Sequence, residues 1–318
     1  MTEVRRIVVD TDTGIDDAHT LLYLAGRADA EIAAITSVFG NCVEPDAARN
    51  IGYVTRLLGL DVPIARGASA PLTGTAHIAG YVHGKDGLGD VGYERPLPDV
   101  TGESAAELLV RLGREHPGEL DLLALGPLTN LGLALRLDPE LFTRYRSVVL
   151  MGGSGPYAPP GTLLMVDANI NNDPEAAEAV FAAPRRELVM VGVNVTATTI
   201  LDEVAIGALR AASNARFATE ILDAYLDFYQ EEWGRRVIPL HDPLAAGILL
   251  DPGFATAWME GPVNVRTNGF MSRARLMRTH DGLPPAFPYR AAPPTKVVTA
   301  VDSARFVADF VDVLTRGN

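Results

Sequence analysis

The sequence predicts an α/β fold in a single domain spanning residues 1–318: a Rossmann-like, mainly parallel central sheet flanked by helices, with a small antiparallel element near the C-terminus. Two observations predict it. Short apolar runs alternate with amphipathic stretches along most of the chain. The apolar runs are hydrophobic on both faces, which is typical of strands in a parallel sheet that helices cover on each side. In such a fold, ligands bind outside the carboxyl ends of the strands.

The expected elements of the first part of the chain follow in order. Strands are expected at residues 6–9, 31–39, 62–65, 120–125, 147–151 and 188–193, and helices at 16–27, 44–60, 103–115, 128–137 and 175–182. Acidic residues at the start of the first helix suit the helix dipole, and Pro45 stands in the first turn of the second helix. Two long loops, residues 67–100 and 152–166, are candidates for function, as long loops in compact domains often are.

The C-terminal part has a different pattern. After about Thr196 it is mostly helical, with helices expected at residues 215–233 and 241–250. Residues 263–279 predict an antiparallel hairpin that turns near Asn268-Gly269. A strand at 296–301 and a helix at 304–314 close the chain.

Composition and charge limit the partners. The formal net charge of -13 would repel phosphates, which argues against DNA, RNA and anionic membranes as partners and permits a metal cation or a neutral small molecule. Cys42 is the only cysteine, so no intrachain disulfide forms and a reducing compartment is expected. The sequence shows no signal peptide and no run of roughly 20 apolar residues. It therefore predicts a cytoplasmic protein that does not enter the membrane.

The strongest local signal is an acidic motif at the end of the first expected strand, VVDTDTGIDDA, residues 8–18. It carries Asp10, Asp12, Asp16 and Asp17, and such a cluster repels itself unless a cation neutralises it. Carboxylate oxygens suit Ca²⁺ or Mg²⁺ rather than zinc. Gly14 permits the tight turn that would fold the carboxylates inward. A plain acidic helix start is the simpler explanation for the last two aspartates, but not for all four.

Two other interpretations of the motif were weighed. In an aspartyl-phosphate phosphatase, a nucleophilic and a helper aspartate follow the first strand as D-x-D, which Asp10 and Asp12 fit; Gly14 then stands where such enzymes usually carry Thr or Val. An EF-hand loop needs a glutamate at its twelfth position and a helix before it, and the sequence predicts neither.

A second signal lies far along the chain, in PLHDPLAAG, residues 239–247. His241 is a candidate acid or base, and Asp242 is a further oxygen ligand for a metal. A His-Asp pair at a helix start is usually only a cap. The pair gains meaning from its combination with the acidic motif.

An ordered set of motifs then resembles one known family. The set is DTDTGIDDA (10–18), Gly40-Asn41, HGKDGLG (83–89), GPLTN (126–130), MGG (151–153), NINNDPEAA (169–177) and HDPL (241–244). It resembles the inosine-uridine preferring nucleoside hydrolase family over nearly the whole chain up to about residue 252. The resemblance implies calcium-dependent hydrolysis of the N-glycosidic bond of ribonucleosides, giving ribose and a free nucleobase. It also implies a homodimer or homotetramer.

The resemblance further implies a calcium site. Asp12, Asp17 and Asp242 would be ligands, with the backbone carbonyl of Leu125 as a fourth. Calcium takes six to eight oxygens, so waters and the ribose diol would fill the remaining positions. Asp242 would thereby also contact the substrate. Asp10 would not touch the ion but would tie the loop and the ligands together.

Catalytic and substrate-binding roles are implied in the same way. Asp12 resembles the general base that takes a proton from a calcium-bound water. His241 resembles the general acid that protonates the departing base. Asp16 and Asn169 resemble the residues that hold the ribose hydroxyls, and Asn41 a polar residue near the water and the sugar. Taken alone, each asparagine would be read as a loop cap.

Two positions on loops complete the expected site. His83 and Tyr81 would fold over the nucleobase, although a solvent-exposed loop histidine is an equally good interpretation of His83. Asp167 stands where relatives often carry a glutamate, and would reach the ribose 5'-hydroxyl. Gly161-Thr162 stands where relatives usually have Gly-Asn. These two departures leave a modified ribose open as the substrate.

Cleavage would pass through an oxocarbenium-like sugar, without a covalent intermediate and with inversion at the anomeric carbon. Two alternatives remain beside the hydrolase. One is a non-catalytic nucleoside- or sugar-binding protein that keeps the metal site. The other is a metal-dependent aspartyl phosphatase with Asp10 as nucleophile.

Overall fold

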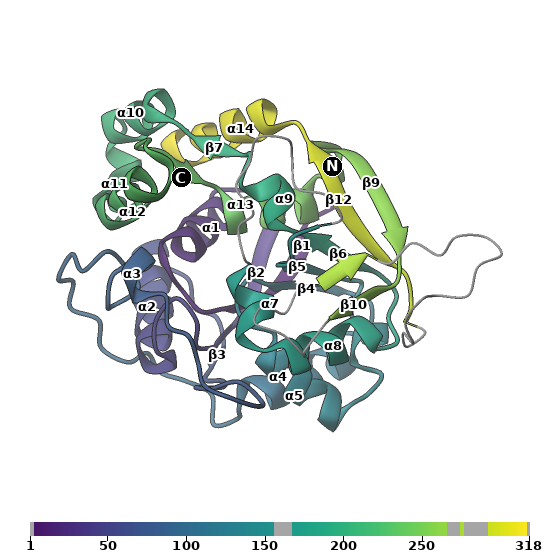
Figure 1. The fold of residues 1–318 in the computed structure, drawn as a ribbon. Helices are drawn as coiled ribbons and strands as arrows, with labels where there is room; N and C mark the ends of the chain where they lie inside the picture. Colours follow the sequence, from purple (N-terminus) through teal and green to yellow (C-terminus); the bar gives the residue numbers. More distant parts are fainter. Residues whose placement is uncertain (1–2, 156–166, 266–273, 277–291, 317–318) are drawn as a thin grey trace.

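The computed structural model describes residues 3–155, 167–265, 274–276 and 292–316 (Figure 1). Its centre is an eight-stranded sheet in the order β3-β2-β1-β4-β5-β6-β12-β9. The strands are β1 (Arg5–Thr11), β2 (Ala30–Ser37), β3 (Ile64–Ala65), β4 (Leu120–Ala124), β5 (Ser147–Met151), β6 (Leu188–Val191), β9 (Ala255–Gly261) and β12 (Thr295–Val301). Every neighbouring pair is parallel except β12 with the edge strand β9. The predicted α/β class with a mainly parallel sheet is confirmed.

Helices cover both faces of this sheet (Figure 1). The longer ones are α1 (Ile15–Ala25), α2 (Glu44–Leu58), α4 (Ala105–Glu115), α5 (Thr129–Leu137), α8 (Pro174–Ala182), α10 (Glu203–Ala211), α12 (Asp223–Trp233), α13 (His241–Leu250) and α14 (Ser303–Arg316). In β1, Val9 packs into a core with α1, α13 and α14, whereas Val8 packs into a second core with α4, α5 and α8. Successive strand residues point to opposite faces, so the continuous apolar runs of the sequence are buried on both sides.

Short elements connect the longer ones. They are α3 (Gly80–His83), α6 (Leu141–Arg144), α7 (Ala168–Asn172), α9 (Val193–Thr196), α11 (Arg216–Glu220), the 3-10 turns η1 (Ser213–Ala215) and η2 (Pro252–Phe254), and the strands β7 (Ile200–Leu201), β8 (Ile238–Pro239), β10 (Val263–Val265) and β11 (Ala274–Leu276). No helix in the described ranges has the length and apolar character needed to cross a membrane.

In the C-terminal part, the structure corrects one expected element, confirms another where it is described, and adds a strand. The single helix expected at 215–233 is wrong, because the chain breaks at Ile221 and Leu222 between α11 and α12. The hairpin expected at 263–279 is confirmed where it is described, since β10 and β11 pair antiparallel, while its turn at Asn268-Gly269 lies outside the described residues. The edge strand β9 was not predicted. It is largely exposed and lacks the apolar run that marks the central strands.

Candidate active site

The segments that follow the central strands meet at the carboxyl end of the sheet, where they line a cavity with the start of α13 and one face of α12. Nine residues that the sequence singled out lie in its wall: Asp16, Asn41, Tyr81, His83, Leu125, Asp167, Asn169, His241 and Asp242. They come from segments far apart in the chain. The structure therefore brings the acidic motif and the HDPL motif to one site, as the motif order predicted.

The turn after β1 sets the positions of Asp16 and Asp17. Thr13 has a φ of 34°, a conformation that a non-glycine residue adopts at some cost, and its backbone N–H donates to Thr11 Oγ1 at 3.0 Å. Helix α1 then starts after Gly14, whose N–H donates to Asp17 Oδ2 at 2.8 Å. Asp16 and Asp17 thus occupy the first turn of a helix, where their charge is favoured.

Three buried carboxylates form the best described metal candidate. Oxygen atoms of Asp16, Asp17 and Asp242 all lie within 4.8 Å of one another. Burial, followed by the charge of Asp17, raises the pKa of Asp16 to about 8, and burial also raises the pKa of Asp17 and of Asp242. Asp16 Oδ1 has no hydrogen-bond partner among the described residues. Like charges packed this closely away from water are stabilised by a cation, and oxygen ligands suit a hard divalent one.

Asp12 joins this cluster through Asn41. The Asn41 side-chain amide donates to Asp12 Oδ1 at 3.2 Å and to Asp17 Oδ2 at 2.8 Å, and its backbone N–H donates to Asp12 Oδ2 at 2.8 Å. Gly40 makes this approach possible, because a Cβ there would lie 1.9 Å from Asp12 Oδ2. Burial, then the charge of Asp17, raises the pKa of Asp12. Asn41 is therefore more than a loop cap, since it bridges two carboxylates.

Asp10, like Asp12 and Asp17, is not among the residues that line the cavity. Asp10 Oδ1 accepts hydrogen bonds from Thr36 Oγ1 and, at 2.7 Å, from Asn130 Nδ2. The same Asn130 amide nitrogen also donates to the Ser37 carbonyl at 2.8 Å. Burial raises the pKa of Asp10 to about 6. This carboxylate ties β1 to β2 and to the GPLTN segment.

His241 is held from both ring nitrogens at the start of α13. Nδ1 lies 2.6 Å from Thr196 Oγ1, and Nε2 lies 3.1 Å from the Tyr229 hydroxyl. Burial lowers the pKa of His241 to about 4. Tyr225, one turn before Tyr229 on α12, donates to Asp16 Oδ2 at 3.4 Å. The sequence analysis did not predict Thr196, Tyr225 or Tyr229 as site residues. The two tyrosines are four residues apart and therefore share a helix face, but aromatic residues at this spacing usually belong to a core.

His83 is buried, not a solvent-exposed loop residue. It ends α3, and its Nδ1 accepts the Ile15 N–H at 3.2 Å and lies 3.8 Å from Asp16 Oδ1. Its ring centroid is 5.0 Å from that of Tyr225, and burial lowers the pKa of His83 to about 3. Tyr81, by contrast, is 78% exposed at the rim of the cavity.

The segment after the second long loop supplies Asp167 and Asn169. Asp167 caps α7, accepting the backbone N–H of Ile170 at 2.7 Å and of Asn169 at 3.2 Å, and burial raises its pKa to about 6. The Asn169 amide donates to the Leu125 carbonyl at 2.6 Å. The carbonyl expected to bind a metal is thus in contact with the asparagine expected to bind ribose. Gly161-Thr162 lie outside the described residues.

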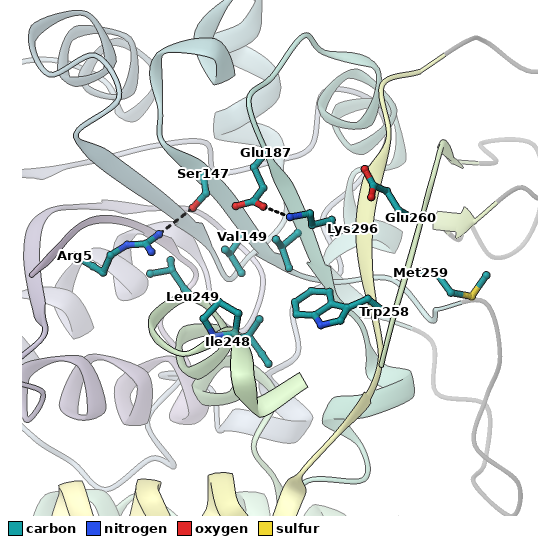
Figure 2. A pocket seen from close by; sticks show the side chains of 12 residues that line it. Arg5, Ser147, Val149, Glu187, Ile248, Leu249, Trp258, Met259, Glu260 and Lys296 are labelled. Atoms are coloured by element: carbon teal, nitrogen blue, oxygen red, sulfur yellow. Dashed lines mark hydrogen bonds and ion pairs between the residues drawn. The ribbon is translucent and has the colours of Figure 1, made fainter. Parts of the chain in front are cut away.

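A second cavity lies at the opposite, amino end of the strands (Figure 2). Two of its charged side chains are paired within the protein: Lys296 with Glu187, and Arg5 with Asp121 at 2.7 Å. Trp258 and Ile248 contribute apolar walls. Within the described residues, the cluster of buried carboxylates lies at the first cavity, so the chemistry is assigned to the carboxyl end of the sheet.

The chain matches known proteins along nearly all of its length. A family model described as inosine-uridine preferring nucleoside hydrolase matches residues 7–308. The chain is 34% identical over 276 residues to a probable uridine nucleosidase 1 of Oryza sativa subsp. japonica, which covers 86% of this chain and 84% of the relative. It is 31% identical over 317 residues to an inosine-uridine preferring nucleoside hydrolase of Crithidia fasciculata, with 98% of each chain covered. A solved plant nucleoside hydrolase superposes with a TM-score of 0.91 at 26% identity, covering 98% of this chain and 99% of the other.

Proposed function

The chain belongs to the inosine-uridine preferring nucleoside hydrolase family, hydrolases that act on N-glycosyl compounds, and we propose that it hydrolyses ribonucleosides to ribose and free base with a bound calcium ion. The observation that carries this proposal is the buried cluster of Asp16, Asp17 and Asp242, of which Asp16 and Asp242 line the same cavity as His241. Carboxylates that can bind a cation and the sugar hydroxyls thus lie in the same site as the His241 imidazole, which can donate hydrogen to the departing nucleobase.

The donor set fits a hard divalent cation. Its atoms are carboxylate oxygens, and Asp16 Oδ1 has no hydrogen-bond partner among the described residues. A divalent cation offsets the cost of keeping these buried carboxylates ionised, which is the main cause of their raised pKa values. Calcium is our choice because it accepts many oxygens in flexible geometry, including Asp12 and the Leu125 carbonyl. When bound, such an ion makes a neighbouring water easier to deprotonate and orients the vicinal ribose hydroxyls.

Residues of the chain carry out the remaining catalytic steps. Asp12, fixed at both oxygens by Asn41, accepts the proton of the attacking water. Asp16 and Asn169, which both line the cavity, receive the ribose hydroxyls. The carboxylates offset the positive charge that develops on the ribosyl ring as the bond breaks. His241 serves the departing base as a hydrogen donor. Water attacks directly, so the anomeric carbon is inverted.

The test is ribose release from inosine, uridine, cytidine and adenosine, with and without a calcium chelator. Relatives are named both for uridine alone and for inosine with uridine, so the panel spans purines and pyrimidines. We expect release that the chelator abolishes and calcium restores, and Asp12→Asn should be folded and inactive. No release from any of the four nucleosides while calcium still binds would reject hydrolysis of standard nucleosides and favour a modified sugar substrate or a sugar-binding protein.

The phosphatase alternative is tested by a matched pair. A phosphatase would lose activity in Asp10→Asn and keep it in Asp12→Asn, with phosphate as product. The two hydrogen bonds that occupy Asp10 Oδ1 favour the opposite result. We also propose a cytoplasmic homodimer or homotetramer that binds no nucleic acid, and light scattering on the purified protein would give the subunit number.

A further inference from the structure

The imidazole of His241 is enclosed by protein groups on both of its nitrogens. Thr196 Oγ1 lies 2.6 Å from Nδ1, and the Tyr229 hydroxyl lies 3.1 Å from Nε2. Thr196 is 0%, Tyr229 2% and His241 7% exposed. Water therefore has little access to the ring, and these two hydroxyls decide how it is oriented and which nitrogen carries hydrogen.

The two hydroxyls belong to different sides of the site. Tyr229 lies in the cavity wall, so Nε2 is the nitrogen on the cavity side. Thr196 is not in the wall; it ends α9, directly after β6, where its backbone N–H donates to the Gly192 carbonyl at 3.1 Å. Within the described part of the chain, His241 Nδ1 is the hydrogen-bond partner of the Thr196 hydroxyl. The threonine hydroxyl therefore acts on the histidine, not on a ligand.

We propose that Thr196 is a positioning residue, whose hydroxyl donates to Nδ1 of His241 and so keeps the ring hydrogen on Nε2, facing the cavity. A neutral imidazole has one donor and one acceptor nitrogen, so a hydroxyl that donates to Nδ1 selects the Nε2–H tautomer. The other tautomer would place the hydrogen beside Thr196, where no nucleobase can reach it. The inference rests on the proposed function, with His241 acting as a neutral imidazole whose Nε2–H donates a hydrogen bond to the leaving base; the base departs with the bonding electron pair, stabilised by this bond, and takes its proton from water.

The direct test compares two substrates whose leaving groups differ. A nucleobase leaves poorly unless a proton or a hydrogen bond stabilises the negative charge it takes up, whereas the 4-nitrophenolate of 4-nitrophenyl β-D-ribofuranoside leaves without such help. In Thr196→Val, which keeps the side-chain shape and removes the hydroxyl, we expect kcat for the best nucleoside to fall about tenfold or more. We expect kcat for the nitrophenyl riboside to stay within about threefold. Thr196→Ser, which keeps the hydroxyl, should restore nucleoside turnover.

Thr199→Val is the matched control. Thr199 is equally buried and only three residues further on, but its hydroxyl contacts the Val195 carbonyl at 3.2 Å and Ser303 Oγ at 3.1 Å, not His241. It should turn over both substrates like the unchanged protein. Equal losses on both substrates in Thr196→Val, or no loss on either, would overturn the proposal, because a group that only shapes the cavity does not distinguish leaving groups.

Ring-nitrogen NMR separates this inference from the proposed function. The chain has 6 histidines, so selective ¹⁵N-histidine labelling with His241→Asn as the assignment reference identifies the His241 signals. We expect the Nε2–H tautomer in the unchanged protein and in Thr196→Ser, and a mixture or the Nδ1–H tautomer in Thr196→Val. An Nδ1–H tautomer in the unchanged protein would overturn the inference even if ribose release is confirmed. The spectra report the His241 tautomer even if no nucleoside is hydrolysed.

Discussion

Asn41 holds both carboxylate oxygens of Asp12, one through its backbone N–H at 2.8 Å and the other through its side-chain amide at 3.2 Å. The same amide nitrogen also reaches Asp17 at 2.8 Å. Asn41 follows β2, whereas the two aspartates follow β1. One neutral side chain thus spaces two like charges and fixes the direction of the proposed base.

Replacing Asn41 should therefore lower catalysis more than it lowers stability. In Asn41→Leu, Asp12 keeps only the backbone N–H as a partner, and its free oxygen can rotate. We expect kcat/KM to fall about 10- to 100-fold, the size typical of groups that orient metal-site ligands. Steady-state ribose release gives this value, with urea unfolding of the same sample as the control for folding. An unchanged kcat/KM would show that Asp12 needs no such support.

Gly40 should tolerate no side chain. Its φ is +154°, and a Cβ would lie 1.9 Å from Asp12 Oδ2. Gly40→Ala must move the carboxylate or the loop, and we expect a loss of about 2 kcal/mol in the free energy of unfolding together with loss of activity. Gly102→Ala is the control, because nothing lies within 4 Å of the added Cβ there. Equal stability of the two variants in urea would contradict this packing argument.

Calcium should stabilise the protein more as the pH rises. In the metal-free protein, burial and Asp17 raise the pKa of Asp16 to about 8, above its unfolded value near 4. A raised folded pKa contributes stability below the unfolded pKa, and this stability is lost as the pH rises through the folded pKa. Calcium binds the ionised cluster, so it offsets this loss.

The measurement is the urea midpoint with saturating calcium and with chelator between pH 5.5 and 8. Ligand at 100 times its dissociation constant adds about 2.7 kcal/mol. The difference between the two curves should widen with pH. A constant difference would mean that these carboxylates do not bind the ion.

A separate pH effect should come from His19 on α1. Its Nε2 lies 2.8 Å from the Ala218 carbonyl, and burial lowers its pKa to about 4. The unfolded chain takes up this proton near pH 6.5 and the folded chain does not, so stability is lost as the pH falls from about 6.5 towards 4. From these values the loss at pH 5 is about 2 kcal/mol.

His19→Gln keeps an amide donor for the Ala218 carbonyl and removes the titration. Its unfolding free energy, measured with calcium present, should fall less between pH 7 and pH 5 than that of the unchanged protein. Parallel pH curves for the two proteins would reject a neutral, buried His19.

Local sequence patterns predicted the strands and helices whose apolar residues form a continuous run or recur at a regular spacing. The apolar runs of β1, β2, β4 and β5 are buried on both faces, so they are visible without the fold. The edge strand β9 was missed because it is partly exposed, and the break at residues 221–222 was missed because both sides of it are helical. Neither feature produces an apolar run or a regular spacing of apolar residues in the local sequence.

The sequence by itself determined the parallel α/β class, and it contains the acidic motif and the ordered motifs that make Asp12, Asp17, His241 and Asp242 candidate site residues. Those signals are carried by residues close together in the chain. Only the tertiary structure decided which carboxylate oxygens meet, that Asp10 bonds Thr36 and Asn130, and that His83 is buried. It alone revealed Thr196, Tyr225 and Tyr229 as partners. A side chain's direction depends on turns and on packing between distant segments, and spacing along a sequence carries neither.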